Sequence, residues 1–198
     1  MPGEEEQHKR ALRAELRERR QLLSEAQRDD AADGVTAQLL ELVRTHGARS
    51  ISCFLSTVTE PGTHRFVEDA VAQGIRVLLP ITREDGLLDW AVAGEGDEIS
   101  EGLFGLPEPA GEVLGPIAVN DVDLMIIPAA AIDIAGTRLG WGRGYFDKTL
   151  GSMQKRPPVY AVIYDSEVVD SLPRELHDQP VDGIVTPTRI ITLSPARD

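Results

Sequence analysis

The sequence lacks the features of a membrane-spanning or disulfide-bonded protein. Its only cysteine, Cys53, has no partner in the chain and sits in the apolar run 51–55. We interpret it as a small core residue rather than a nucleophile, which fits a reducing cytoplasm. No run of 18 apolar residues is present, so no membrane-spanning helix is expected. The acidic start also lacks the apolar stretch of a secretory signal. The four histidines are scattered and do not have the spacing of zinc ligands.

Basic charge is also scarce. The chain has 20 lysines and arginines against 33 acidic residues, which gives a net charge of −13. A nucleic-acid partner is therefore not expected, because phosphate binding needs a basic surface. Seven of the basic residues nevertheless lie within residues 1–28. This concentration predicts a local anion site on an otherwise acidic body.

Residues 9–23 are rich in good helix formers and predict a basic N-terminal helix within residues 1–23. Helical spacing places four cations on one face: Lys9, Arg13, Arg17 and Arg20. A solvated charged face is the simplest interpretation of such a row. An anion-binding face is the alternative, because few acidic residues lie nearby to neutralise the row.

Beyond this helix, apolar strands alternate with helical patterns. Strands are expected at residues 51–55, 75–79, 87–92, 122–127, 159–164, 183–186 and 189–192. A capping box at Ser24 and Gln27 starts a helix that Gly47 ends. Further helices are expected after Thr63, which can cap the first of them, and over 144–153 and 166–171. A long surface connection is expected over 94–116, with residues 104–107 packed down onto the body. The alternation predicts one three-layer α/β/α domain over residues 1–198, with a mostly parallel sheet.

The most specific segment is the glycine-rich stretch 136–148. Gly140, Gly142 and Gly144 alternate between a predicted strand and a predicted helix, where backbone N–H groups can approach an anion. Arg138 and Arg143 add positive charge. The stretch is neither a Walker A loop nor a dinucleotide fingerprint, because the residues that define those motifs are absent. A tight strand-to-helix turn is the alternative interpretation. Asp147 suits either the helix dipole or Mg²⁺.

Residues 138–147 closely resemble the signature loop of the 5-formyltetrahydrofolate cyclo-ligase family, and the resemblance extends over nearly the whole chain. Residues 9–13 resemble the family's nucleotide-binding Lys-x-x-Leu-Arg element, and residues 104–109 resemble its Phe-Gly-Ile-x-Glu-Pro segment. Leu55 and Glu60 match folate-contacting positions, and His177-Asp178 matches the position of a second Mg²⁺ ligand. Four positions of the glycine-rich stretch depart from common family choices or are variable: Trp141, Arg143, Phe146 and Lys148.

The resemblance implies a site. ATP would be bound by Lys9, Arg10, Ala11, Leu12, Arg13, Arg138, Leu139, Gly140, Trp141, Gly142, Arg143, Gly144, Tyr145 and Phe146. Folate would be bound by Leu55, Glu60, Trp141, Gly142, Arg143, Gly144 and Tyr145. Asp147 and Asp178 would hold Mg²⁺. Arg143 and Tyr145 would be the catalytic residues, with Arg143 stabilising the transferred phosphoryl group and Tyr145 orienting the folate.

The implied protein is a ligase of folate and one-carbon metabolism. It would use ATP and Mg²⁺ to close 5-formyltetrahydrofolate into 5,10-methenyltetrahydrofolate through phosphorylation of the formyl oxygen, with release of ADP and phosphate. We expect a cytoplasmic monomer with no membrane or nucleic-acid partner. Two alternatives remain open: a different enzyme on a related architecture, such as a sugar-phosphate isomerase or coenzyme A transferase, and a non-catalytic paralogue that binds folate or nucleotide.

Overall fold

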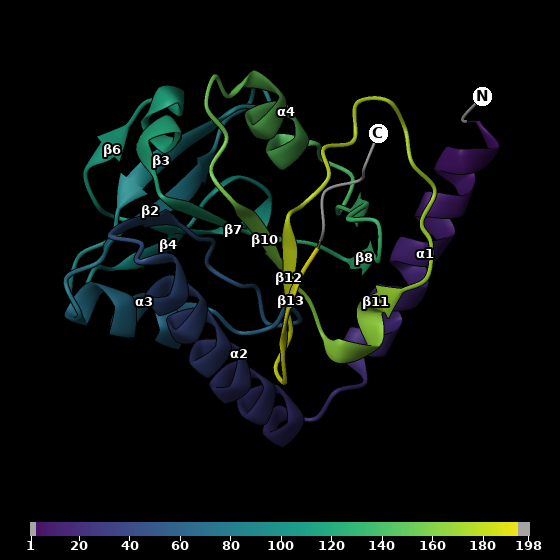
Figure 1. Cartoon of the computed structure of the whole chain (residues 1–198), viewed down its shortest axis with the longest axis horizontal. Helices are drawn as coiled ribbons and strands as arrows, with labels where there is room; N and C mark the ends of the chain where they lie inside the picture. The colour runs from purple at the N-terminus through teal and green to yellow at the C-terminus, as the bar shows by residue number, and fades with distance from the viewer. Residues whose placement is uncertain (1–2, 194–198) are drawn as a thin grey trace.

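An eight-stranded mixed sheet forms the centre of the computed structural model, which describes residues 3–193 (Figure 1). The strand order is β13-β12-β10-β7-β1-β2-β3-β6. The five strands from β12 to β2 run parallel, and β13, β3 and β6 pair antiparallel at the two edges. The strands are β1 Ser50–Ser52, β2 Arg76–Thr82, β3 Leu88–Val92, β6 Val113–Leu114, β7 Leu124–Pro128, β10 Val159–Val162, β12 Gly183–Val185 and β13 Ile190–Thr192.

Helices cover both faces of this sheet. Helices α2 (Glu25–His46) and α3 (His64–Ala72) lie below it in Figure 1, and α4 (Tyr145–Ser152) lies above it. Side chains alternate along β7: Leu124 and Ile126 pack in the cluster with α2 and α3, while Met125 and Ile127 pack in the cluster with α4. The predicted layered α/β fold with a mostly parallel sheet is confirmed.

Helix α2 begins and ends where the sequence predicts. The Ser24 hydroxyl accepts from the N–H of Gln27, and the Gln27 side chain accepts from the N–H of Ser24, so the predicted capping box is present. Gly47 follows the helix at φ 58°, a left-handed conformation that glycine adopts without steric cost.

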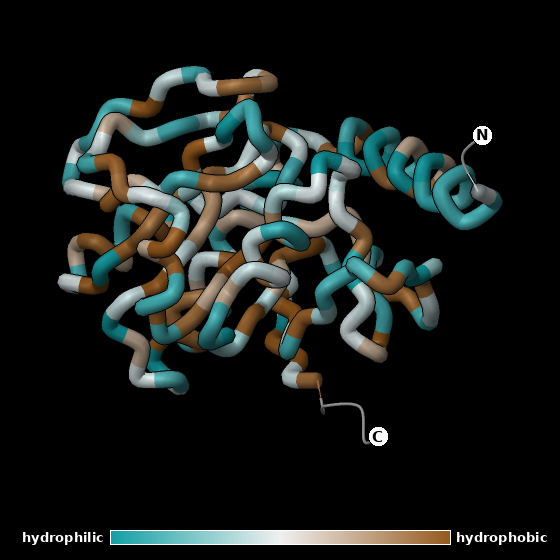
Figure 2. Tube along the Cα trace, turned by 90° about the horizontal axis from the view of Figure 1, so that it is seen from above, coloured by the Kyte–Doolittle hydropathy of each residue, from teal (hydrophilic) through white to brown (hydrophobic). Residues whose placement is uncertain are grey.

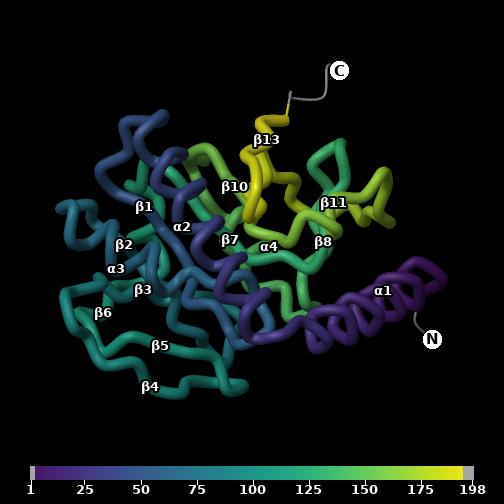
Figure 3. Tube along the Cα trace, turned by 90° about the horizontal axis from the view of Figure 1, so that it is seen from below, coloured from purple at the N-terminus to yellow at the C-terminus, as the bar shows by residue number. Residues whose placement is uncertain are grey.

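Helix α1 (Glu4–Gln21) lies beside the main sheet rather than on one of its faces (Figures 1 and 3). Its neighbour is a small sheet of β8 (Ala131–Asp133), β9 (Arg138–Leu139) and β11 (Val168–Val169). Most residues of α1 are hydrophilic, and its N-terminal end projects from the body (Figure 2). The predicted N-terminal helix is confirmed, and it starts at Glu4 rather than at residue 9. Residues 1, 2 and 194–198 of the predicted domain lie outside the described residues.

The ends of β1 and β2 differ most from the sequence prediction. Strand β2 continues through Pro80, where its end was predicted, and Pro80 pairs with Trp90 of β3. The pairing of β1 with β2 ends at Ser52 opposite Leu78, so no strand on that side needs an N–H from Pro80. Strand β1 itself was predicted to reach residue 55 but ends at Ser52, although residues 53–55 are still buried.

The connection over 94–116 is more ordered than predicted. It contains the hairpin of β4 (Ile99–Glu101) and β5 (Pro107–Pro109), closed by the 3₁₀ turn η1 (Leu103–Gly105), and is followed by the 3₁₀ helix η2 (Pro116–Asp121). Phe104 is 58% exposed and has a φ of 61°, so the expectation that it packs into the core is wrong.

Two local predictions in other connections also fail. Thr63 precedes α3, but its side chain does not cap the helix: its hydroxyl accepts from the N–H of Ser56 at 3.0 Å and donates to the Phe54 carbonyl at 2.6 Å. The helix expected over 166–171 is the 3₁₀ turn η3 (Asp165–Glu167) followed by β11. Within residues 3–193, no helix is long and apolar enough to cross a membrane.

The core beneath α2 gives a stability prediction. Leu39 is fully buried there, whereas Leu22, between α1 and α2, is 79% exposed. Leu39→Ala is expected to lower the free energy of unfolding by about 2–5 kcal/mol, because it removes buried methyl groups and leaves a cavity. Leu22→Ala makes the same chemical change at the surface and is expected to stay within about 0.5 kcal/mol of the parent. Urea unfolding of both variants tests the difference. Equal losses of unfolding free energy would contradict the placement of Leu39 in the core.

Candidate active site

The candidate site lies at the point where the order of the parallel strands reverses. The chain leaves β1 toward β2 on one side and later places β7 on the other side of β1. Loops that follow such strands open a crevice at their carboxyl ends, which is the usual ligand position in open α/β sheets. A cavity of about 1070 Å³ lies there, lined by residues of α1, the loop after β1, the glycine-rich loop and residues 175–179.

The glycine-rich loop forms one wall of this cavity. Gly142 and Gly144 have φ values of 96° and 73°, a region that side chains disfavour, so both positions require glycine. Within residues 3–193, the backbone N–H groups of 140–144 donate no hydrogen bond. Gly144 also begins α4 without a side-chain cap, which leaves the N–H groups of the first helical turn unpaired. The loop therefore offers free donors where an anion can bind.

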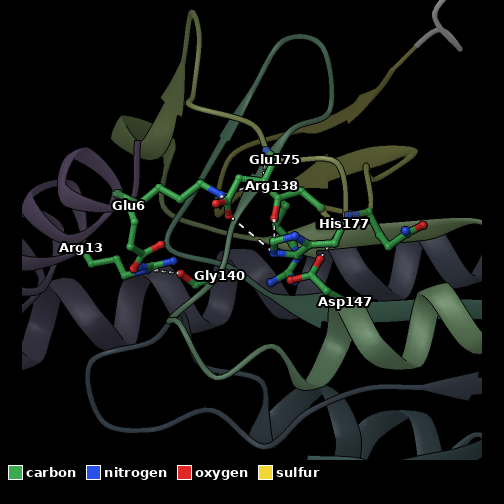
Figure 4. A network of polar contacts seen from close by, with 10 residues as sticks. Glu6, Arg13, Arg138, Gly140, Asp147, Glu175 and His177 are labelled. Carbon is green, nitrogen blue, oxygen red and sulfur yellow. Dashed lines mark hydrogen bonds and ion pairs between the residues drawn. The ribbon is translucent and has the colours of Figure 1, made fainter. Parts of the chain in front are cut away.

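The basic row of α1 faces the body, so the solvated-face interpretation is wrong for this helix. Lys9 is 4% exposed, and its ammonium lies 2.9 Å from Glu175 and 2.7 Å from Asp178. Arg13 donates from Nε to the carbonyl of Gly140 at 2.8 Å (Figure 4). Both residues and Arg17 line the cavity. Sequence reasoning found this row but could not identify Glu175, which is far away in the chain.

Arg20, the fourth member of the row, is not part of the cavity wall. It is 1% exposed and forms two hydrogen bonds with Glu167, at 2.7 and 2.8 Å, and one with the carbonyl of Ala129 at 2.9 Å. It therefore fixes α1 to the body rather than offering a charge to a ligand. The sequence did not predict Glu167 as the partner of Arg20, because the two residues are 147 positions apart and no local pattern links them.

The two predicted Mg²⁺ ligands, Asp147 and Asp178, both line the cavity, and their role as ligands of one ion stays a prediction. Asp147 lies 3.1 Å from the Arg138 guanidinium and accepts from the N–H of Gln179, the residue after Asp178, at 3.2 Å (Figure 4). Asp178 pairs with Lys9. Burial alone would raise the pKa of Asp178, but the hydrogen bonds from Lys9 and from the N–H of Glu175 outweigh it and lower that pKa.

The same interaction acts on Lys9 in the opposite direction. Burial would lower the pKa of the Lys9 ammonium, but hydrogen bonds to Asp178 and Glu175 outweigh burial and raise it.

A possible metal site lies at residues 175–178. Potential metal-ligand atoms lie within 4.8 Å of one another on Glu175, His177 and Asp178. The carboxylates of Glu175 and Asp178 are oxygen donors of the kind that a hard cation such as Mg²⁺ prefers, whereas His177 offers a nitrogen, and Asp147 is not part of this cluster.

The opposite wall of the cavity contains Leu55 and Glu60, the predicted folate positions. Glu60 accepts from the N–H of Thr57 at 2.8 Å. Burial raises the pKa of its carboxyl, although that hydrogen bond and the charge of Arg20 oppose the effect. Leu55 offers an apolar contact for the face of a heterocyclic ring, and the Glu60 carboxylate offers a polar contact for its edge.

The two predicted catalytic residues, Arg143 and Tyr145, both line the cavity. The Arg143 guanidinium lies 3.6 Å from the centre of the Phe104 ring, so the β4–β5 turn reaches the glycine-rich loop. The Tyr145 hydroxyl donates to the Arg83 carbonyl at 2.9 Å, which leaves the ring to line the cavity. Phe104 was missed as a neighbour of Arg143.

The remaining predicted positions divide into two groups. Leu139, Trp141 and Phe146 line the cavity. Arg10 and Ala11 are exposed on α1 and do not line it, and Leu12 instead packs against the cluster that contains Leu139. The structure therefore gives these three ATP-binding assignments no support, and the assignments of the other positions stay predictions as well. Burial raises the pKa of the Cys53 thiol to about 12, as expected for a core cysteine rather than a nucleophile.

Comparison with known proteins identifies the family. The model of the 5-formyltetrahydrofolate cyclo-ligase family matches residues 5–187. The chain belongs to this family. A 5-formyltetrahydrofolate cyclo-ligase from Mycolicibacterium smegmatis is 32% identical over 186 residues, which cover 91% of this chain and 94% of the relative. The Escherichia coli K12 cyclo-ligase is 29% identical, covering 88% of this chain and 98% of the relative.

Solved structures agree with this family assignment. The 5,10-methenyltetrahydrofolate synthetase of Aquifex aeolicus matches with a TM-score of 0.80 and 27% identity, covering 96% of this chain and 95% of that one. The synthetase from Mycoplasma pneumoniae, at 20% identity, has the same fold, with a TM-score of 0.72 and coverage of 90% and 98%. The predicted membership in the cyclo-ligase family is confirmed.

The docking of α1 gives a second stability prediction. Glu167→Gln is expected to lower the free energy of unfolding by about 3–5 kcal/mol, because it leaves the buried Arg20 charge without its counterion. Glu15 pairs with Arg19 on the surface of the same helix, so Glu15→Gln is the matched control and should be almost neutral. Thermal and urea unfolding compare the two. A Glu167 variant as stable as the control would show that this pair does not hold α1.

Proposed function

We propose that the protein is an ATP-dependent cyclo-ligase that converts 5-formyltetrahydrofolate to 5,10-methenyltetrahydrofolate, with release of ADP and phosphate. Family membership supports this activity. The observation that carries it in the structure is the single cavity that holds the free amides of the glycine-rich loop, the α1 cations, two carboxylates and the folate-side residue Glu60. All of these groups come from one chain, so we expect a monomer to be sufficient, and the buried Cys53 agrees with a cytoplasmic protein.

ATP would bind in the part of the cavity that is lined by cations. Lys9, Arg13 and Arg138 would bind the triphosphate together with the free amides of Gly140, Gly142 and Gly144. A helix N-terminus and several backbone N–H groups stabilise phosphate without moving far. In an otherwise acidic protein, these are the groups that give the site local positive charge.

Mg²⁺ would be held by Asp147 and Asp178, and when bound it would neutralise charge on the phosphates. In the ligand-free chain each of these carboxylates already has a cation, Arg138 and Lys9 respectively. Binding of the nucleotide with its metal would then let the two cations turn to phosphate oxygens while the carboxylates turn to the ion. This exchange avoids leaving any of the four charged groups unpaired in a buried site.

The folate end would use Leu55 against the apolar face of the substrate and Glu60 at its polar edge. The Tyr145 ring would fix the orientation of the substrate, and because its hydroxyl is already bonded to Arg83, its role would be positioning. Held in this way, the formyl oxygen can lie in line with the terminal phosphate, and such positioning is the main protein contribution to phosphoryl transfer.

The reaction would proceed in two steps. The formyl oxygen attacks the γ-phosphorus, a new O–P bond forms, and the bond to ADP breaks, which gives an iminium phosphate. N10 then attacks the formyl carbon and loses its proton, the C–O bond breaks, and phosphate leaves with that oxygen. Arg143 would stabilise the charge on the transferred group, as a preorganised cation can.

The direct test follows the growth of methenyltetrahydrofolate absorbance when purified protein meets 5-formyltetrahydrofolate. We expect growth only when ATP and Mg²⁺ are both present. Stoichiometric binding of folate and ATP without any product would identify the alternative, a non-catalytic binding paralogue. Turnover without ATP would overturn the proposed chemistry.

Arg143 provides a prediction about catalysis. If it acts mainly in the transition state, Arg143→Ala should lower kcat by roughly 10² to 10³ and raise the KM for ATP much less. Arg143→Lys should recover much of the activity by restoring the charge. Steady-state kinetics separates the two constants. A large rise in KM with kcat intact would make Arg143 a ground-state phosphate anchor.

Glu60 provides a prediction about pH. Its pKa is raised above its usual value of 4.5, so it becomes protonated at a higher pH than an exposed glutamate. If its negative charge binds folate, the KM for 5-formyltetrahydrofolate should rise as pH falls through this raised pKa. Glu60→Gln should show a raised KM that no longer changes over that pH interval. An unchanged pH profile in the variant would remove Glu60 from the folate site.

A further inference from the structure

Trp141, at the centre of the glycine-rich loop, lies against two cations of α1. The guanidinium carbon of Arg20 lies 4.9 Å from the centre of the Trp141 ring, and that of Arg17 lies 5.5 Å from it. Both distances are within the range of favourable cation–π contacts, for which tryptophan is the best aromatic partner. Sequence reasoning left open whether this indole stacks on a ligand or covers the loop.

Arg20 is the fixed member of this contact. Its guanidinium is buried and donates hydrogen bonds to the Glu167 carboxylate and to the carbonyl of Ala129, which fix its position. The Trp141 ring, by contrast, has no hydrogen bond from its N–H within residues 3–193. A buried indole N–H usually finds a partner, so here contacts of the ring, rather than a hydrogen bond, determine its position.

The neighbours of Trp141 in the loop are attached to the same helix. Gly140 accepts from Arg13, and the Arg13 guanidinium also lies against Gly142, where a side chain would meet it at 3.6 Å. Residues 140–142 therefore rest on α1 at each position, between the end of β9 and the start of α4. No donated backbone hydrogen bond holds them elsewhere in the described chain.

We propose that Trp141 is a positioning residue that fixes the glycine-rich loop to α1 and thereby sets the loop amides relative to Lys9 and Arg13. The inference rests on the proposed nucleotide site. It predicts that the aromatic ring supports nucleotide affinity through the geometry of the loop, and that folate does not stack on it. Arg20 acts in the same way through Trp141, without touching a ligand.

The test compares Trp141→Leu, which removes the aromatic ring, with Trp141→Phe, which keeps one. Trp141→Met is a second non-aromatic variant if the leucine protein does not fold by circular dichroism. Calorimetry with a non-hydrolysable ATP analogue and Mg²⁺ gives nucleotide affinity. Hydrogen exchange of the α1 amides, without any ligand, reports on the contact itself, and neither measurement requires turnover. A failure of the cyclo-ligase assay would thus be distinguishable from a failure of this inference.

We expect the non-aromatic variant to bind the ATP analogue roughly tenfold more weakly, which corresponds to about 1.4 kcal/mol, and to exchange its α1 amides faster. The phenylalanine variant should stay within about threefold of the parent in both measurements, because it keeps an aromatic face for Arg20. Loss of folate affinity with unchanged ATP affinity would overturn the proposal in favour of stacking on folate. Equal behaviour of the leucine and phenylalanine variants, or unchanged exchange in the leucine variant, would also overturn it.

Discussion

The buried ion pair between Arg20 and Glu167 is the interaction on which the candidate site depends. It joins an N-terminal helix, which adds no strand or layer to the main sheet, to the turn that follows β10. A buried pair of this kind has a substantial desolvation cost, so it adds little net stability, but it strongly disfavours any arrangement that separates the partners. Its effect is to specify where α1 sits, and this placement brings Lys9 and Arg13 to the glycine-rich loop.

With α1 docked, the charged side chains of the site form ion pairs with one another. Lys9 is matched by Asp178 and Glu175, and Arg138 is matched by Asp147. Within residues 3–193, the backbone amides of residues 140–144 donate no hydrogen bond. In the proposed mechanism, Mg²⁺ brings positive charge and the phosphates bring negative charge into this arrangement, so binding exchanges the partners of existing ion pairs instead of leaving buried charges unpaired. This is a physical reason for a small acidic protein to bind a polyanion together with its metal.

Local patterns in the sequence predicted the features that depend on local physics. The capping box at Ser24, the left-handed glycine at Gly47 and the 3.6-residue period of the α1 cations all follow from neighbouring residues, and the layered fold followed from the alternation of elements. The recognised loop motif gave the family. What the sequence could not give were pairings between distant segments, such as Arg20 with Glu167, Lys9 with Glu175, and Arg143 with Phe104. Pro80 was misjudged for the same reason, because its place in β2 depends on where the neighbouring strand β1 ends.

The central claim is that α1 completes the nucleotide site through Lys9 and Arg13. Calorimetric affinity for Mg²⁺ and ATP in the double variant Lys9→Met/Arg13→Met tests it most directly. Arg19→Met/Arg44→Met is the matched control, because it removes the same charge from exposed helical positions that do not line the cavity. We predict that the first variant loses at least roughly a hundredfold in affinity, since two contacts between charged groups are removed, while the control changes little at moderate salt. Equal losses in the two variants would contradict the account, because the affinity would then depend only on the overall charge of the protein.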